Sequence, residues 1–184
     1  MGFHHVAFAC RDLAATHRFY TEACGFELTK AVVGPTDVPG GWAKHVFYDT
    51  GTASVANGQP GPMIAFWELH DDRMVGNDTA LSTGLGYEPW VNHIAFAADS
   101  VGDLEARRDR WLAHGHDAMQ IDHGFCVSAY TMDPNGVLVE FCVDTRPYTE
   151  EDKRHALEAL TATAPELEGA PTPQFFRAID FQPA

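Results

Sequence analysis

The sequence predicts an α+β fold with two tandem βαβββ modules that form a partly open β-barrel, followed by a C-terminal helix and tail. The main observation is an internal repeat, because HVAFA from His5 recurs as HIAFA from His93. Both copies are short apolar runs typical of strands, and each precedes a segment of helical periodicity. Since neither copy alone would cover both faces of its sheet, we expect the two copies to pack together.

Apolar runs bounded by turn signals predict the later strands of each module. The first module has such runs at residues 44–49 and 63–69, and the second at 125–132 and 137–143. The last two are joined by DPNG, residues 133–136, which is a strong turn signal. We expect the order β-α-β-β-β in each module.

These boundaries divide the chain into four parts. We expect a first module at 1–70, a connecting loop at 71–90, a second module at 91–145 and a C-terminal helix with an extension at 146–184. A loop this long in a compact domain is often functional. The last part begins with Thr149 as a helix N-cap, and the aromatic side chains of its tail are expected to pack on the body or on a second subunit.

Composition limits the class of partner. The chain has 184 residues, 45% of them hydrophobic, and a formal net charge of −14, which disfavours nucleic acid or an anionic membrane as partner. Four cysteines without metal-site spacing suggest buried free thiols in a reducing compartment. There is neither a signal-peptide pattern at the start nor a long apolar run, so we expect a soluble cytoplasmic protein.

Alternation along the strands selects candidate site residues. His5 and His93 each share a strand face with small alanines, which leaves room for a ligand. Glu140 interrupts an apolar strand, and a buried unpaired carboxylate is costly. Glu68 stands near the end of the run MIAFWEL in the first module. A lone strand histidine is more often structural, but two His and two Glu in a repeat suggest convergence on a divalent Fe, Mn, Ni, Co or Zn ion.

The repeat resembles the vicinal oxygen chelate superfamily, which includes glyoxalase I, extradiol dioxygenases, epimerases and bleomycin-resistance proteins. HHVAFACRDLAATHRFYTEACGFE looks like its opening strand and helix, and DPNGVLVEF like its closing hairpin, so the resemblance covers residues 3–145. It implies that His5, His93 and Glu140 are metal ligands and that Glu68 stands where glyoxalase I has its fourth.

The spacing from His123 through Tyr130 and DPNG to Glu140 is similar to the extradiol dioxygenase signature, apart from Ala129, where a larger residue is usual. This resemblance implies an Fe(II) enzyme that cleaves a catechol-like ring with O₂. His123 would be the acid/base, and Tyr130 would orient the oxygenated intermediate. Glu68 would either support the metal ligands without binding the metal itself or hold an amine or hydroxyl group of the substrate. In an unbroken strand His123 and Tyr130 would face opposite ways, so we expect Gly124 to permit a bulge or loop.

Two alternatives stay open. A lyase, isomerase or epimerase of the glyoxalase I type would bind Ni or Zn through two His and two Glu, and one glutamate would abstract a proton alpha to a carbonyl. It leaves His123 and Tyr130 without a clear role. A non-catalytic drug-binding resistance protein suits the acidic balance, but such relatives usually lack the metal set. A homodimer is compatible with each of these functions.

Overall fold

The computed structural model, which describes residues 3–51, 61–74 and 76–183, confirms the α+β fold with two βαβββ modules. The elements of the first module are β1 His5–Ala9, α1 Leu13–Arg18 with a π-helical continuation Phe19–Ala23, β2 Glu27–Pro35, β3 Trp42–Asp49 and β4 Met63–His70. Those of the second are β5 His93–Ala97, α2 Val101–Ala113, β6 Ala118–Asp122, β7 Cys126–Met132 and β8 Leu138–Asp144.

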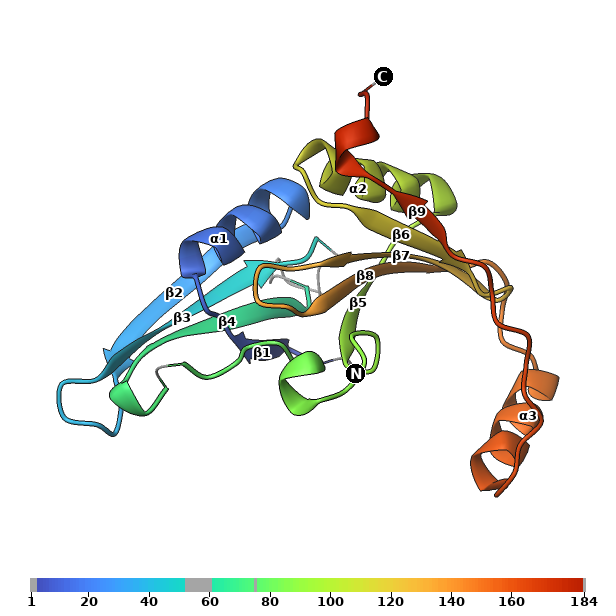
Figure 1. The fold of residues 1–184 in the computed structure, drawn as a ribbon, viewed down its shortest axis with the longest axis horizontal. Coiled ribbons are helices and arrows are strands. Elements are labelled where there is room, and N and C mark those ends of the chain that lie inside the picture. Colours follow the sequence, from blue (N-terminus) through green and yellow to red (C-terminus); the bar gives the residue numbers. More distant parts are fainter. Residues whose placement is uncertain (1–2, 52–60, 75, 184) are drawn as a thin grey trace.

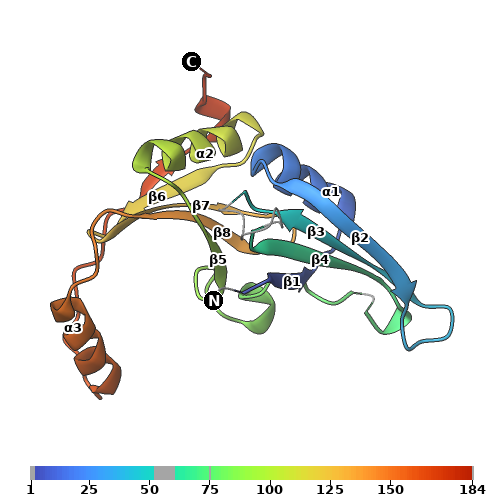
Figure 2. The same cartoon turned by 180° about the vertical axis from the view of Figure 1, so that it is seen from behind.

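Short 3₁₀ turns, Asp72–Met74 and Thr83–Leu85, lie in the connection between the modules. The C-terminal part contains α3 Glu150–Thr161, the short strand β9 Gln174–Phe176 and a 3₁₀ turn Ala178–Asp180. Thr149 caps α3 as expected, in a capping box with Asp152. In Figures 1 and 2, α3 projects away from the two modules.

The described strands form two separate sheets and no closed barrel. Their orders are β1-β4-β3-β2 and β5-β8-β7-β6-β9, so β9 of the tail extends the second sheet. In each module the first strand runs parallel to the last, and the other pairs are antiparallel. Figure 1 shows the sheets arranged as an arch, with α1 and α2 on the same outer side.

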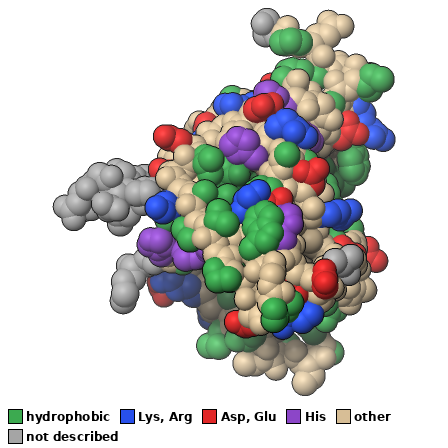
Figure 3. Space-filling model, turned by 90° about the vertical axis from the view of Figure 1, so that its left-hand side faces the viewer, with side chains coloured by type: hydrophobic (Ala, Val, Ile, Leu, Met, Phe, Trp, Pro, Cys, Tyr) green, Lys and Arg blue, Asp and Glu red, His purple; other side chains and the backbone are tan. Residues whose placement is uncertain are grey.

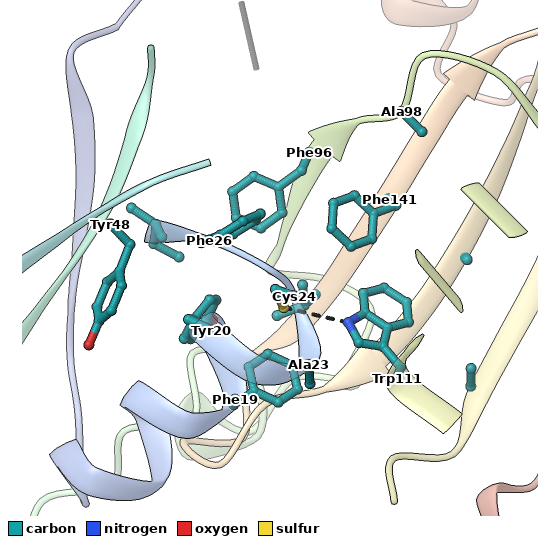
Figure 4. Close-up of a cluster of buried hydrophobic side chains, with 14 of the residues drawn as sticks. Phe19, Tyr20, Ala23, Cys24, Phe26, Tyr48, Phe96, Ala98, Trp111 and Phe141 are labelled. Carbon is teal, nitrogen blue, oxygen red and sulfur yellow. Dashed lines mark hydrogen bonds between the residues drawn. The ribbon is translucent and has the colours of Figure 1, made fainter. Parts of the chain in front are cut away.

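The core lies between the helices and the sheet faces that they cover. Figure 4 shows Tyr20 and Phe26 of the first module close to Phe96 and Trp111 of the second. The ring centroids of Phe26 and Phe96 are 4.9 Å apart, and the indole N–H of Trp111 donates to the Cys24 sulfur at 3.5 Å. Burying such aromatic surface is the main stabilisation of the joined modules.

The predicted DPNG turn is observed, and it also connects the modules. Asn135 is completely buried, and its side-chain oxygen accepts from the Arg11 backbone N–H at 2.9 Å. Its amide donates to Thr16 Oγ1 at 3.1 Å, and the Tyr20 hydroxyl donates to Asp133 at 3.0 Å. Burial raises the pKa of the Asp133 carboxyl. The hairpin β7–β8 is therefore fixed to the first helix of the other module.

The four cysteines are free, and Cys10, Cys24 and Cys126 are buried, as expected. Within the described ranges no helix is long and apolar enough to cross a membrane. Figure 3, which shows the side formed by the first module, has acidic and basic side chains interspersed with hydrophobic and histidine side chains.

Candidate metal and catalytic site

The candidate residues lie on the sheet faces that point away from the helices, which we call the histidine faces. In β5, Ile94 and Phe96 turn toward the core, whereas His93, Ala95 and Ala97 are exposed. The same alternation occurs in β1, where His5 is exposed and Val6 packs on the core. The predicted strand parity of both histidines is thus observed, and the small alanines leave space beside them.

His93 and Glu140 form the centre of the site. The Glu140 side chain is only 7% exposed, and its Oε2 lies 3.2 Å from His93 Nε2. The other ring nitrogen of His93, Nδ1, contacts the Trp90 backbone carbonyl at 2.9 Å. A proton on Nδ1 satisfies that carbonyl and leaves the lone pair on Nε2, which is the usual orientation of a metal-binding histidine. This buried carboxylate and oriented imidazole fit a divalent cation.

Tyr130 and His123 extend the site beside Glu140. Tyr130 lies directly opposite Glu140 in the β7–β8 pairing. Its hydroxyl is 3.1 Å from His123 Nε2. Burial raises the pKa of Tyr130 to about 12, and the nearby Glu140 carboxylate adds to the rise. The hydroxyl is therefore protonated at neutral pH.

The local backbone explains how His123 reaches Tyr130 despite the spacing of seven residues. His123 follows the last residue of β6, and Gly124 has a φ of +82°, which disfavours other residues. The Asp122 side chain accepts from the Gly124 N–H at 2.7 Å and stabilises this turn. The expected break at Gly124 is observed. Ala129, the departure from the extradiol pattern, lies on the core side and is completely buried.

His5 is not brought to the other ligands. It is exposed, its Nδ1 lies 2.8 Å from His4 Nδ1, and its ring is 5.2 Å from that of Phe47. Within the described part of the chain, no three His, Cys, Asp or Glu side chains are grouped to hold a metal. The structure therefore collects His93, Glu140, Tyr130 and His123 but leaves His5 apart.

The strand register does not place Glu68 at the position that matches Glu140. In β8 the partner of Ala95 is Glu140, and in β4 the corresponding partner of Ala7 is Ala65. Glu68 lies three residues further on, an odd number, so its side chain points to the opposite face of the sheet. There its carboxylate lies 2.7 Å from Lys44 Nζ and 3.3 Å from His70 Nε2.

The environment of Glu68 is that of a structural ion pair. Burial alone would raise its pKa, but hydrogen bonding by Lys44 and His70 brings the pKa below its usual value. Nothing in this arrangement links Glu68 to His93 or to Tyr130. The predicted catalytic role of Glu68 at the metal therefore has no geometric support.

Sequence reasoning missed two contributors near the histidines. The Trp90 carbonyl orients His93, and a backbone group leaves no trace in the residue pattern. His45 stacks on Trp67 with ring centroids 3.8 Å apart and lies 6.0 Å from the ring of His5. Its Nε2 is buried and has no hydrogen-bond partner among the described residues. The sequence signal that could have identified His45 is its spacing of two residues from Phe47, which places both side chains on one face of β3.

Comparison with known proteins gives the family. Residues 2–141 match the model of the Glyoxalase/Bleomycin resistance protein/Dioxygenase superfamily. The chain belongs to this superfamily. A search of curated proteins found no match.

Solved structures show the same fold at low sequence identity. A glyoxylase/bleomycin resistance protein/dioxygenase domain from Frankia sp. EAN1pec is 22% identical, with a TM-score of 0.56, over 78% of this chain and 98% of that one. The fosfomycin resistance protein FosX from Listeria monocytogenes is 19% identical, with a TM-score of 0.51, over 83% of this chain and 98% of that one. A point mutant of that FosX, in complex with Mn(II) and 1S,2S-dihydroxypropylphosphonic acid, is 20% identical with a TM-score of 0.51, over 83% and 97%.

Proposed function

We propose that this protein is a metal-dependent enzyme for a small molecule with two adjacent oxygen atoms, and that it is an Fe(II) extradiol-type dioxygenase for a catecholic ring. The observation that carries the proposal is the His123–Tyr130 pair, 3.1 Å apart, beside the His93–Glu140 pair. It combines a metal-binding pair with two groups that can hold or transfer protons.

The metal ligands in this proposal are His93, Glu140 and His5. A divalent ion bound by two histidines and one carboxylate would draw in both substrate oxygens, lower their proton affinity and keep a position for O₂. Fe(II) is favoured, and Mn, Co, Ni and Zn accept the same donors. Superfamily membership supports a metal in general, and the identity of the ion rests on the extradiol-like spacing.

Tyr130 and His123 have distinct tasks in this proposal. Because its pKa is raised to about 12, Tyr130 stays protonated and donates a hydrogen bond to a substrate oxygen. His123 accepts a proton from the catechol and returns it during ring opening. Glu140 Oε2 and His93 Nε2, 3.2 Å apart, would face the same metal ion, and the Trp90 carbonyl holds the orientation of His93 through Nδ1.

A second copy of the chain supplies His5 in this proposal. Three features support sharing between two copies. His5 is exposed and joins no group of three donors among the described residues. Its face also bears the exposed apolar side chains of Trp67 and Leu69, which a partner would cover. A twofold dimer would then contain two identical sites, each with residues from both copies.

The glyoxalase-type alternative receives less support, because Ala65 stands where a second carboxylate is needed and Glu68 is paired with Lys44 and His70. A non-oxidative reaction with Mn(II) is the second candidate. It is favoured by the FosX mutant that was crystallised with Mn(II) and a dihydroxypropylphosphonic acid, a ligand with two adjacent oxygens.

The test is anaerobic reconstitution with Fe(II), followed by a panel of catechols with O₂ uptake and the yellow absorbance of ring-opened product as readouts. A parallel sample with Mn(II) is assayed in the same way and with a glyoxal-type hemithioacetal and an epoxide. We expect ring cleavage that depends on Fe(II) and is lost in His93→Ala. No ring-opened product from any catechol, together with turnover of either other substrate, would refute the dioxygenase assignment.

A further inference from the structure

A cavity of about 320 Å³ adjoins the candidate site on the second sheet, next to the C-terminal tail. Its lining includes Tyr130 and the apolar side chains of Met119, Met132, Leu138 and Phe175. Its volume is near the lower limit of ordinary small-molecule pockets. The cavity is therefore large enough for part of a ligand and is apolar on most sides.

Strand register places this cavity in line with the proposed catalytic groups. Met119 of β6 is paired with Tyr130 on one side and with Phe175 of β9 on the other. Directly paired residues point to the same face of a sheet, so these three side chains form one row on the histidine face. Leu138 is the partner of His93 in the β5–β8 ladder. A ligand in the cavity would thus touch both Tyr130 and the neighbourhood of His93.

The tail is held firmly where it lines the cavity. Asp117 accepts from the guanidinium of Arg177 at 2.6 Å and from the Ala178 backbone N–H at 2.8 Å. The guanidinium of Arg108 lies 4.1 Å above the ring of Phe176, which packs on the core. The expectation that the tail packs on the body is met for Phe176 and Phe181, whereas Phe175 is 72% and Ile179 is 92% exposed.

These contacts leave Phe175 with no role in the core. It is a large apolar side chain at a defined position over the cavity, and exposing it to water is unfavourable unless something covers it. The tail also lies beyond residue 141, where the superfamily match ends. Through Phe175 the tail contributes to the border of the candidate site.

We propose that β9 completes an apolar subsite, in which an alkyl or aryl substituent of the substrate binds against Phe175, Met119 and Met132. This inference rests on the proposed function, since the substrate's paired oxygens would lie at Tyr130 and Glu140. The preferred substrate is then a catechol with an apolar substituent rather than catechol itself. At the rim, Arg177 and Asp117 pair with each other, so the subsite offers no net charge to attract an ionic group.

The first experiment measures binding without metal or catalysis. Protein labelled with ¹³C at the methionine methyl groups is titrated with 4-butylphenol, and with phenol as the matched short probe. We expect 4-butylphenol to shift the signals of Met119 and Met132. Met74 and Met63 border two other cavities, and their signals should not move. Shifts confined to Met63 or Met74, or no shifts, would overturn the subsite.

Variants of the tail test the role of Phe175. Phe175→Ala should weaken 4-butylphenol binding about tenfold, which corresponds to about 1.4 kcal/mol. Ile179→Ala is the control, because Ile179 is on the same tail and does not border the cavity. Equal binding by both variants would count against the proposal. Loss of 4-butylphenol binding at protein concentrations that favour the dimer would mean that a second copy fills the cavity, and would also overturn the proposal.

A kinetic measurement separates this inference from the proposed function. If the enzyme cleaves catechols, kcat/KM should be higher for 4-butylcatechol than for catechol, and Phe175→Ala should reduce this ratio while Ile179→Ala preserves it. Phe175-dependent probe binding without any ring cleavage would retain the subsite and reject the dioxygenase. Ring cleavage with neither probe binding nor a preference for the substituted catechol would reject the subsite alone.

Discussion

The two modules have the same strand pairing but different chemistry on their histidine faces. Across the second sheet, the row that contains Ala95 continues with Glu140 and Tyr130. The corresponding row of the first sheet, from Ala7, continues with Ala65 and Phe47. A carboxylate and a hydroxyl in one module thus correspond to a methyl group and a phenyl ring in the other.

This difference shows that the two modules share the fold and a histidine at the start of the first strand, while the compared row carries a carboxylate and a hydroxyl in the second module alone. His5 and His93 are equivalent, since each pairs with the first described residue of its partner strand. In the proposed function the first module therefore contributes one ligand, and the second contributes the remaining chemistry.

The largest effect is expected when the second module is made like the first. Glu140→Ala removes the only carboxylate near His93 within the described residues. Losing a group that only supports a metal ligand lowers metal affinity by up to about 100-fold, so losing the ligand itself should lower it by more. Elemental analysis after equilibrium dialysis measures this. Glu105→Ala, an exposed carboxylate on α2, is the control. Stoichiometric metal in Glu140→Ala would contradict the assigned ligand.

Mixing two defective chains tests whether the modules of different copies share a site. His5→Ala and Glu140→Gln should each lose metal and activity. In a twofold dimer, an equal mixture after unfolding and refolding should regain about one quarter of the wild-type sites, because half of the dimers are mixed and each has one intact site. No recovery, with both variants folded, would mean that His5 and Glu140 must belong to one chain or that His5 is no ligand.

Tyr130→Phe gives the second module the ring that Phe47 provides in the first. The fold should tolerate the change, metal content should stay constant, and turnover should fall about 10²-fold, in the lower range for a positioned proton donor. His123→Ala should lower turnover by about 10² to 10⁴. Oxygen uptake and metal analysis are measured on the same samples. If both variants match the wild type, these residues have structural roles only.

A smaller effect concerns the link between the modules. Asn135→Ala removes hydrogen bonds to Arg11, Thr16 and Asp133 at a fully buried position. The free energy of unfolding, measured in urea, should therefore fall by about 1–3 kcal/mol. Asn77→Ala, at an exposed position, is the control. The corresponding β3–β4 connection of the first module falls largely on residues 52–60, outside the described ranges. A difference below about 0.5 kcal/mol would show that the buried turn is not a stabilising link.

The features that follow local rules could be predicted from the sequence. The repeat, the strand runs and the DPNG turn are encoded in short patterns, and the alternation of side chains assigns His5 and His93 to a face without knowledge of partners. Gly124 also signals the turn that brings His123 to Tyr130. These predictions use only neighbouring residues along the chain.

The features that depend on register or on packing could not be predicted in this way. Matching Glu68 with Glu140 requires knowing which residues of β1 and β4 pair, and an error of one residue reverses the face. The separation of His5 from His93 depends on how the modules pack. The pairing of β9 with β6 involves only three residues of a tail, too few for a periodic signal.

The smallest effect is expected for Glu68, because its position in the first module does not match its predicted role at the metal. Glu68→Gln should leave metal content unchanged and alter stability by less than about 1 kcal/mol, because the Glu68 and Lys44 side chains remain 23% and 38% exposed and such pairs are weak. The pKa of Glu68 is lowered in the folded state, so its contribution is present above the reference value of 4.5 and is lost as the pH falls through the folded pKa. Urea unfolding at pH 7 and pH 3, with Lys44→Met as the matched partner variant, should show a difference from wild type only at pH 7. Metal loss in Glu68→Gln would instead restore Glu68 as a fourth ligand and favour the lyase.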